Sequence, residues 1–241
     1  MMSVVQLSPS IIIQALPIML RISLFCIAFF GIESNFRTVV AEERQNAAAQ
    51  TTEEGFQSLF DGTSLESWEG NTAWFRIEEK AIVAGSLKEK IPHNEFLCTK
   101  KRYGDFELRL EVKLRGEGEN AGVQFRTERI PNHTEVSGYQ ADVGVAFKRP
   151  VWGALYDESR RKKMLAEGPA EDVPKWVKEG DWNELAISAK GSKIQIRLNG
   201  HLTTDYTEED STIARDGIIG LQIHSGPPTE ALYRNIRIKT E

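Results

Sequence analysis

The sequence predicts an all-β fold of two packed antiparallel sheets. Every second residue of 105–114 is apolar and the residues between are charged, and such alternation is typical of a half-buried strand because successive side chains point to opposite faces. The alternation recurs in residues 194–198, and Asn199-Gly200 after them is the preferred chemistry of a two-residue hairpin turn. Short runs punctuated by Gly and Asn, without a long amphipathic helix, indicate two antiparallel sheets packed face to face.

Further strands are predicted where short runs of alternating apolar residues recur along the chain. They cover residues 74–78, 82–84, 95–99, 121–127, 139–145, 182–189, 202–206, 218–224 and 232–238. The phase of residues 105–114 predicts that Leu110 lies in the core and Glu111 on the opposite face. Residues 158–177 are charged and carry two prolines, so they form one long excursion of the kind that is usually functional or disordered.

Residues 1–41 are predicted to be an export signal. Residues 22–32 have the length and apolar character of a signal-peptide core, Arg21 precedes them, and residues 39–41 offer the small side chains that a signal peptidase recognises. Translation could begin at Met19, which would give a compact basic start. The sequence therefore predicts an exported protein, periplasmic or extracellular, with an uncleaved N-terminal anchor as the alternative.

A stable membrane span is not expected once this signal is removed. Pro17 and Arg21 divide the apolar stretch, and a charged residue at the centre of a spanning helix is costly. Residues 42–53 are polar and without apolar period, which is typical of a flexible leader. Residues 54–241 remain as one domain with enough chain for a sizeable core.

Charge and cysteine content exclude several classes of protein. The net charge of −5 at pH 7 argues against a nonspecific nucleic-acid binder. Residues 160–163 form the one basic cluster, either a solvated loop or a contact for an anionic ligand. Cys26 follows the bulky Phe25 and is not expected to carry a lipid anchor, and Cys98 lies in a predicted strand where a buried thiol is the common outcome.

No context-free catalytic signature is present in the sequence. There is no glycine-rich phosphate loop, no Cys-x-x-Cys pair, no His-Glu-x-x-His and no Gly-x-Ser-x-Gly. The four histidines are not spaced like a metal site, and His93, His133 and His201 look like loop or turn residues.

Three predicted strands carry planar or hydrogen-bonding side chains opposite their apolar faces. Sugars are recognised by such groups together with an aromatic ring, whereas an ordinary solvated face would favour Lys and Glu. The alternative is that these are simply the polar outer faces of a sandwich. The residues are Gln124 and Arg126, Gln140 and Asp142, and Gln222 and His224.

A series of motifs along the domain resembles the 3-keto-disaccharide hydrolase family, formerly a domain of unknown function. One is Gly138-Tyr139-Gln140-Ala141-Asp142. The others are residues 56–62, 65–68, 103–108, 120–126, 153–157, 181–183, 198–200, 220–224 and 233–236. Each piece is weak alone, but together they span the predicted domain in the family's order. Residues 155–161 depart from the pattern by leading into the long excursion, where many members are short, so a different substrate is expected.

The resemblance implies a concanavalin A-like jelly-roll sandwich, with the ligand on the concave sheet as in related glucanases and lectins. It also implies cleavage of glycosides oxidised at carbon 3, by a hydrolase or lyase of carbohydrate-degrading bacteria. The alternatives are a carbohydrate-binding domain without catalysis, because the same sandwich can bind sugar only, and a structural protein of the envelope.

The implied chemistry assigns roles to the candidate site residues. A ketone at carbon 3 acidifies the hydrogen on carbon 2, so a base can remove it and the aglycone can leave from carbon 1, after which water adds. His224 is the candidate base, Asp142 could orient it or serve instead, and Arg126 faces the enolate oxygen. No organic cofactor is expected, but a divalent ion held by Asp142 could replace Arg126 in that role.

Substrate contacts are expected from side chains around these three. Gln140, Gln222 and Trp152 would hold the sugar, and Tyr156, Glu107 and Gln124 are expected neighbours. The expected partner is a carbohydrate substrate, with no nucleic acid and no stable membrane span.

Overall fold

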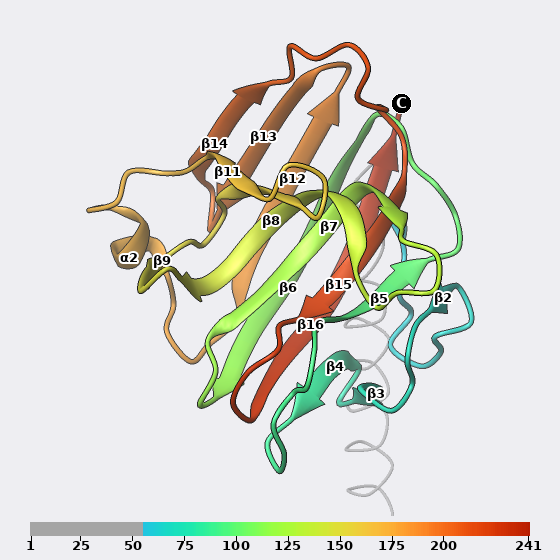
Figure 1. Cartoon of the computed structure of the whole chain (residues 1–241), viewed down its shortest axis with the longest axis vertical. Coiled ribbons are helices and arrows are strands. Elements are labelled where there is room, and N and C mark those ends of the chain that lie inside the picture. The colour runs from blue at the N-terminus through green and yellow to red at the C-terminus, as the bar shows by residue number, and fades with distance from the viewer. Residues whose placement is uncertain (1–54) are drawn as a thin grey trace, which may run out of the picture. The chain divides into compact units, whose positions relative to one another are not determined.

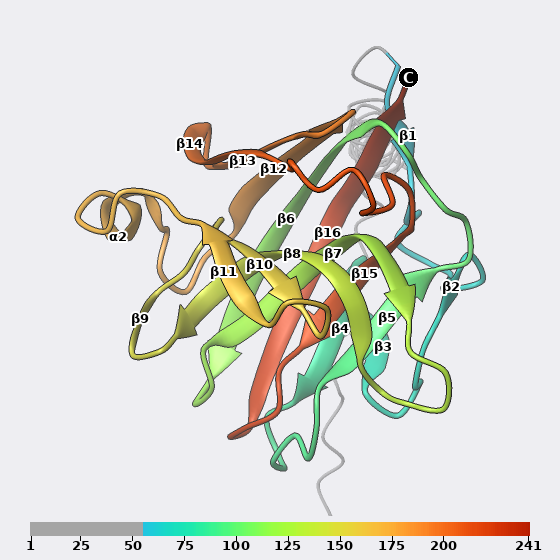
Figure 2. The same cartoon turned by 45° about the horizontal axis from the view of Figure 1, so that its top comes forward.

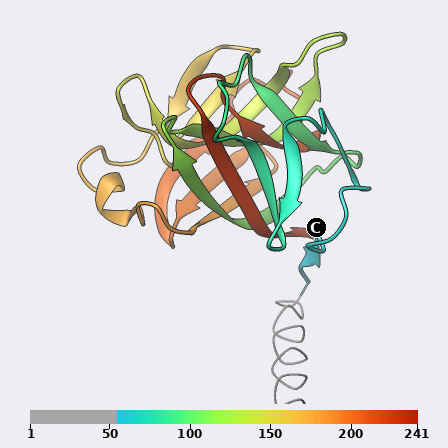
Figure 3. The ribbon, with the colours of Figure 1, turned by 90° about the horizontal axis from the view of Figure 1, so that it is seen from below.

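The computed structural model describes residues 55–241, so the predicted signal and leader lie outside the described residues. Sixteen strands are named along the described part of the chain, and they form two antiparallel sheets. The predicted all-β class is confirmed. Seen from below, the two sheets lie one over the other (Figure 3).

Sheet A has the order β14-β13-β12-β6-β16-β4-β3, and β1 pairs with β16 outside that path. Its long central strands, β6 and β16, pair along most of their lengths. In the order of the sheet the strands are β14 (His201–Thr207), β13 (Lys193–Leu198), β12 (Asn183–Lys190), β6 (Phe106–Gly116), β16 (Thr229–Thr240), β4 (Ala81–Ser86), β3 (Phe75–Glu78) and β1 (Gln57–Ser58).

Sheet B has the order β11-β10-β8-β7-β15-β5-β2, and β9 pairs with β8. Its strands in that order are β11 (Lys163–Ala166), β10 (Leu155–Glu158), β8 (Val136–Ala146), β7 (Asn120–Arg129), β15 (Ile218–Ile223), β5 (Glu95–Thr99), β2 (Trp68–Glu69) and β9 (Arg149–Pro150). A short helix, α2 (Val173–Trp176), lies beside the sandwich (Figure 1).

The core fills the space between the two sheets. Along β6 the burial alternates residue by residue, and Leu110 has an exposed fraction of 0%. Phe106 of sheet A meets Phe125 of sheet B edge to face, with ring centroids 6.2 Å apart, and aromatic pairs of this kind add to the stabilisation that burial provides. The predicted phase of this strand is therefore confirmed.

The Asn-Gly turn between β13 and β14 also forms as predicted. Asn199 and Gly200 both have positive φ, and Leu198 pairs with His201 across the two-residue turn. The long excursion contains more structure than expected, because β11 pairs with β10 and α2 follows it.

Cys98 is buried as predicted, and burial raises the pKa of its thiol to about 12. The thiol is thus neutral at ordinary pH, which fits a packing role. Among residues 55–241, none of the helices has the length and hydropathy of a membrane span.

Candidate functional site

The outer face of sheet B brings together side chains from three neighbouring strands, β15, β7 and β8. Cross-strand register places Gln222 beside Gly122, Gly122 beside Asp142, and Gln124 beside Gln140. Their alternating neighbours point into the core, so these residues share the outer face. Gln124, Gln140, Asp142 and Gln222 are nonetheless all buried, with exposed fractions of 0–4%.

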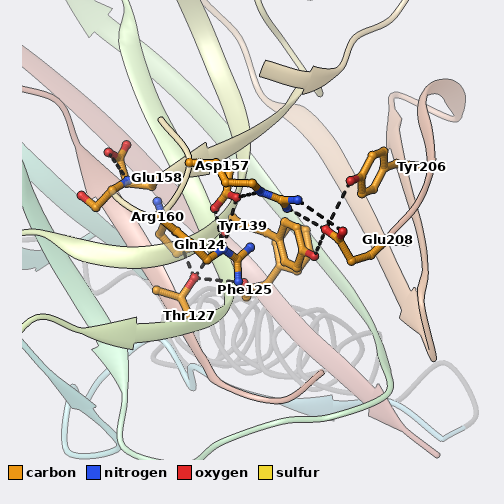
Figure 4. Close-up of polar contacts among 11 residues, drawn as sticks. Gln124, Phe125, Thr127, Tyr139, Asp157, Glu158, Arg160, Tyr206 and Glu208 are labelled. Atoms are coloured by element: carbon orange, nitrogen blue, oxygen red, sulfur yellow. Dashed lines mark hydrogen bonds and ion pairs between the residues drawn. The ribbon is translucent and has the colours of Figure 1, made fainter. Parts of the chain in front are cut away.

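Two hydrogen bonds join part of this face into a chain that ends on Asp142. The Thr127 hydroxyl lies at its start, with Oγ1 3.1 Å from Gln124 Oε1 and 2.9 Å from the carbonyl oxygen of Phe125 (Figure 4). Gln124 Nε2 donates to Gln140 Oε1 at 2.5 Å, and Gln140 Nε2 donates to Asp142 Oδ1 at 2.6 Å. Each donor fixes the orientation of the next amide, so the carboxyl of Asp142 is held in place by a satisfied network.

Gly122 leaves space for the Gln140 side chain in this hydrogen-bond network. A Cβ atom at this position would lie 2.4 Å from Gln140 Cδ. The absence of a side chain on Gly122 therefore lets Gln140 cross toward its neighbours.

Burial raises the pKa of Asp142 to about 7, and the neighbouring charge of Glu158 adds to the effect. The hydrogen bond from Gln140 acts in the opposite direction because it stabilises the carboxylate. A carboxyl with a pKa near neutrality can exchange a proton at physiological pH, which is the property required of a general base or acid.

Tyr156 and Glu158 extend the face along β10. Tyr156 pairs in register with Gln140, and Glu158 lies two residues further along the same side. The pKa values of both groups are raised, in each case mainly by burial.

His224 lies at the end of β15, two residues beyond Gln222. Its Nδ1 is 2.7 Å from the carbonyl oxygen of Ser225. A carbonyl can only accept, so this contact assigns a proton to Nδ1 and leaves Nε2 of the neutral ring as an acceptor. The described contacts of Asp142 and His224 go to Gln140 and Ser225, so Asp142 does not orient His224 as one prediction had it.

Arg126 does not join the outer face. It lies in a β-bulge where the register shifts, and its φ is +45°. The bulge reverses the direction of its side chain. Its guanidinium donates to the carbonyls of Gly104 and Gly191 and to Asp105 Oδ1, at 2.7–3.1 Å. The prediction that Arg126 faces the enolate is therefore not supported by its position.

Glu107 and Trp152, which were expected to contact the substrate, lie away from the outer face of sheet B. Glu107 is on the outer face of sheet A, where Arg109 Nε donates to it at 2.7 Å. Trp152 belongs to the core between the sheets and lines a cleft of about 510 Å³ together with Leu114 and Gly144. Neither is brought to the face that carries Asp142.

The basic cluster of residues 160–163 is mostly engaged inside the protein. Arg160 and Arg161 pair with the fully buried Asp157, and Arg161 also reaches Glu208 at 2.6 Å. Tyr139 donates to the same Glu208 carboxylate at 2.6 Å (Figure 4). These arginines tie the β10–β11 turn to the segment after β14, so the solvated-loop interpretation holds only for the exposed Lys162 and Lys163.

Sequence reasoning missed Glu135 and Asn94. Asn94 Nδ2 donates to Glu135 Oε1 at 3.0 Å, and the pKa of Glu135 is raised mainly by burial. Glu135 precedes a predicted strand in a polar turn, so no periodicity singled it out. Among residues 55–241, no group of three or more His, Cys, Asp or Glu side chains is arranged to hold a metal ion.

Comparison with solved structures shows the fold. A provisionally named glycosyl hydrolase from Parabacteroides distasonis matches with a TM-score of 0.60 and 22% identity, over 78% of this chain and 100% of that one. The carbohydrate-binding module CBM66 from Bacillus subtilis matches with a TM-score of 0.51 and 13% identity, over 72% and 96% of the two chains. The β-glucanase of Bacillus licheniformis matches with a TM-score of 0.51 and 11% identity, over 79% and 100%. The fold is thus the jelly-roll sandwich of glucanases and lectins, as predicted.

The family is shown by the sequence itself. The model of the 3-keto-alpha-glucoside-1,2-lyase-like domain matches residues 55–239, and the chain belongs to this family. The resemblance noted in the sequence motifs is thereby confirmed. No curated protein matches the sequence.

Proposed function

We propose that this protein is an exported enzyme that cleaves 3-keto-glycosides at the outer face of sheet B. Membership of the 3-keto-alpha-glucoside-1,2-lyase-like family supports this choice of substrate class. The observation that carries the proposal is the buried carboxyl of Asp142, whose pKa of about 7 suits proton transfer and whose position is fixed by Gln140.

Asp142 is the proposed base. Its ionised carboxylate takes the proton from carbon 2, and the electron pair of that bond is delocalised onto the carbon 3 oxygen as an enolate. The enolate then re-forms the ketone while the bond from carbon 1 to the aglycone oxygen breaks, leaving a double bond between carbons 1 and 2. Addition of water to carbon 1 completes a net hydrolysis.

Gln222 replaces Arg126 as the proposed donor to the enolate oxygen. Its side chain is fully buried, and neither amide atom has a hydrogen-bond partner among the described residues. An amide N–H held ready for a developing oxyanion is an established means of stabilising a transition state. His224 Nε2 remains an acceptor at the rim and is the alternative base.

A sugar-binding role without catalysis is the second candidate. The likeness to the CBM66 module shows that this sandwich architecture also occurs in binding modules. Binding alone would not require a carboxyl with a pKa near neutrality, and for this reason we favour the enzyme.

An assay of aglycone release distinguishes the two functions. Purified protein is incubated with a 3-keto-glucoside and, in parallel, with the unoxidised glucoside. An enzyme releases aglycone from the 3-keto compound only, and Asp142→Asn lowers that turnover at least about a hundredfold. Parallel assays with EDTA establish whether a divalent ion takes part. Binding of sugar without release of aglycone by the wild type would favour the non-catalytic function.

A further inference from the structure

The hairpin between β7 and β8 curls over sheet B toward β5 (Figures 1 and 2). Three polar contacts hold it there. Arg129 Nε donates to Glu69 Oε1 of β2 at 2.9 Å, and Arg102 pairs with Glu128 at 2.6 Å. The third contact is the hydrogen bond from Asn94 to Glu135. The hairpin thereby carries Glu135, just before β8, onto the outer face.

Asn94 fixes the orientation of the Glu135 carboxyl. The backbone N–H of Ser225 donates to Asn94 Oδ1 at 2.9 Å, so the Asn94 amide nitrogen is free to donate to Glu135 Oε1. Oε1 is thus an acceptor in this contact. If the carboxyl is protonated, the proton belongs on Oε2, because Oε1 is already occupied by an N–H group.

Three buried polar atoms on this face have no partner in the described structure. They are Glu135 Oε2 and both amide atoms of Gln222. Burying polar groups without hydrogen bonds is costly, and native structures retain few such groups without a functional reason or a bound polar molecule. The Gln222 side chain is fully buried, and His224 two residues beyond it lies within electrostatic reach of Glu135. These atoms indicate a site for a polar ligand between β15 and the hairpin.

The surroundings of Glu135 favour its protonated form. Burial is the main reason that its pKa is raised, while the Asn94 hydrogen bond, His133, His224 and Lys162 act in the opposite direction. Glu158 of β10 faces it with a like charge, and the pKa of Glu158 is also raised, by burial and then by Glu135. Glu158 in turn raises the pKa of Asp142, so the three carboxyls belong to one electrostatic group.

We propose that Glu135 is a second catalytic residue at this site, the general acid that protonates the departing aglycone oxygen. The inference rests on the proposed function, because it assigns the acid that complements the base Asp142. In the elimination step Asp142 gains the carbon 2 proton. The bond between carbon 1 and the aglycone oxygen breaks, its electron pair stays on that oxygen, and the Oε2 proton of Glu135 is transferred to it.

The basicity of the leaving group distinguishes this role from a structural one. A methyl 3-keto-glucoside loses a strongly basic alkoxide and needs an acid, whereas the 4-nitrophenyl compound loses a stable phenolate and does not. Glu135→Gln keeps the acceptor for Asn94 but cannot supply a proton. Glu128→Gln removes a carboxylate of the same hairpin outside the site but keeps an oxygen that can accept from Arg102, so the hairpin stays in place and the variant is the matched control.

We expect Glu135→Gln to lose at least about a hundredfold in kcat on the methyl substrate and to change little on the 4-nitrophenyl substrate. Glu128→Gln should match the wild type on both. Equal losses on the two substrates, or wild-type turnover of the methyl compound by Glu135→Gln, would overturn the assignment of Glu135. Failure of the wild type on both substrates would overturn the proposed function itself.

Discussion

Burial of Asp142 couples the chemistry of the site to the stability of the protein. The carboxyl is almost fully buried on a sheet face, and its pKa is about 7 rather than the ordinary 3.8. The folded protein therefore holds a proton on this group over a pH range in which the unfolded chain has released it. Residues placed for catalysis often carry such a cost.

The pH dependence of activity follows from this pKa. A base must be ionised to act, so kcat/KM on the 4-nitrophenyl 3-keto-glucoside, whose leaving group needs no acid, should rise with pH and level off above about 7. Measurement of the pH–rate profile checks this. A profile without an ascending limb near pH 7 would exclude Asp142 as the base.

The same pKa predicts a stability change in Asp142→Asn. Between pH 4 and 7 the unfolded carboxyl ionises while the folded one remains protonated, so the wild type loses stability as the pH rises. The stability of the variant does not fall in this way, because an Asn side chain does not ionise. Its amide oxygen still accepts the hydrogen bond from Gln140 Nε2. Above pH 7 it should be the more stable protein by at most about 4 kcal/mol. Urea unfolding of both proteins at pH 4 and pH 8 measures the difference, and a gap that does not widen with pH would contradict the raised pKa.

Gly122→Ala tests the hydrogen-bond chain without removing any of its members. The new methyl would displace the Gln140 side chain, whose Cδ lies 2.4 Å from the position of the added Cβ. Because the obstacle is a side chain rather than backbone, we expect the protein to fold but to lose turnover at least tenfold, roughly the lower end of what positioning effects provide. Wild-type kcat in the folded variant would show that Gln140 does not position Asp142.

At the scale of the elements, β6 shows how directly alternation specifies a strand. Its apolar residues face the core and its charged residues pair with other strands, as between Glu111 and Arg234. The predicted strands match observed ones closely, whereas the short strands β1, β2, β9, β10 and β11 were not predicted because two to four residues are too few to show a period. That reasoning could not foresee the bulge at Arg126, since a single inserted residue leaves no trace in the pattern.

The position of Glu135 was equally beyond sequence reasoning. Its contact with Asn94 joins residues 41 positions apart and depends on the curvature of the β7–β8 hairpin. By contrast, Gln124, Gln140, Asp142 and Gln222 could be placed on one face because each lies on a regular strand.

Substitutions in β6 test the strand phase. Leu110→Ala should lower the free energy of unfolding by about 2–5 kcal/mol, because it leaves a cavity in a fully buried position. Glu111→Ala removes partly exposed contacts with Arg234 and Asn235 and should cost less than about 1 kcal/mol. Chemical denaturation measures both, and equal losses would contradict the assignment of faces.

At the scale of the whole molecule, a jelly-roll sandwich supports a buried polar face on one sheet. The core between the sheets holds the fold together without a disulfide among residues 55–241, where Cys98 is a free thiol. Rigid strands hold Gln124, Gln140, Asp142 and Gln222, whereas the curled hairpin contributes Glu135. The architecture itself occurs in binding modules and in hydrolases, so function is argued from the site.

We propose that residues 1–41 direct export of the protein and are then removed. Cleavage after residues 39–41 should give a mature protein that begins near Glu42. N-terminal sequencing of protein recovered outside the cytoplasm checks this. A mature chain that starts at Met1 or Met19 would favour a retained anchor instead.

Solvent deuterium incorporation at carbon 2 is the most direct test of the central claim. When the wild type cleaves a 3-keto-glycoside in D₂O, elimination followed by hydration predicts deuterium at carbon 2 of the released 3-keto sugar, detected by NMR. Asp142→Asn should lose both aglycone release and deuterium incorporation. As a control, the free 3-keto sugar is incubated under the same conditions with the variant to measure spontaneous exchange. Aglycone release with no deuterium at carbon 2 would contradict proton abstraction by Asp142 and support direct displacement at carbon 1.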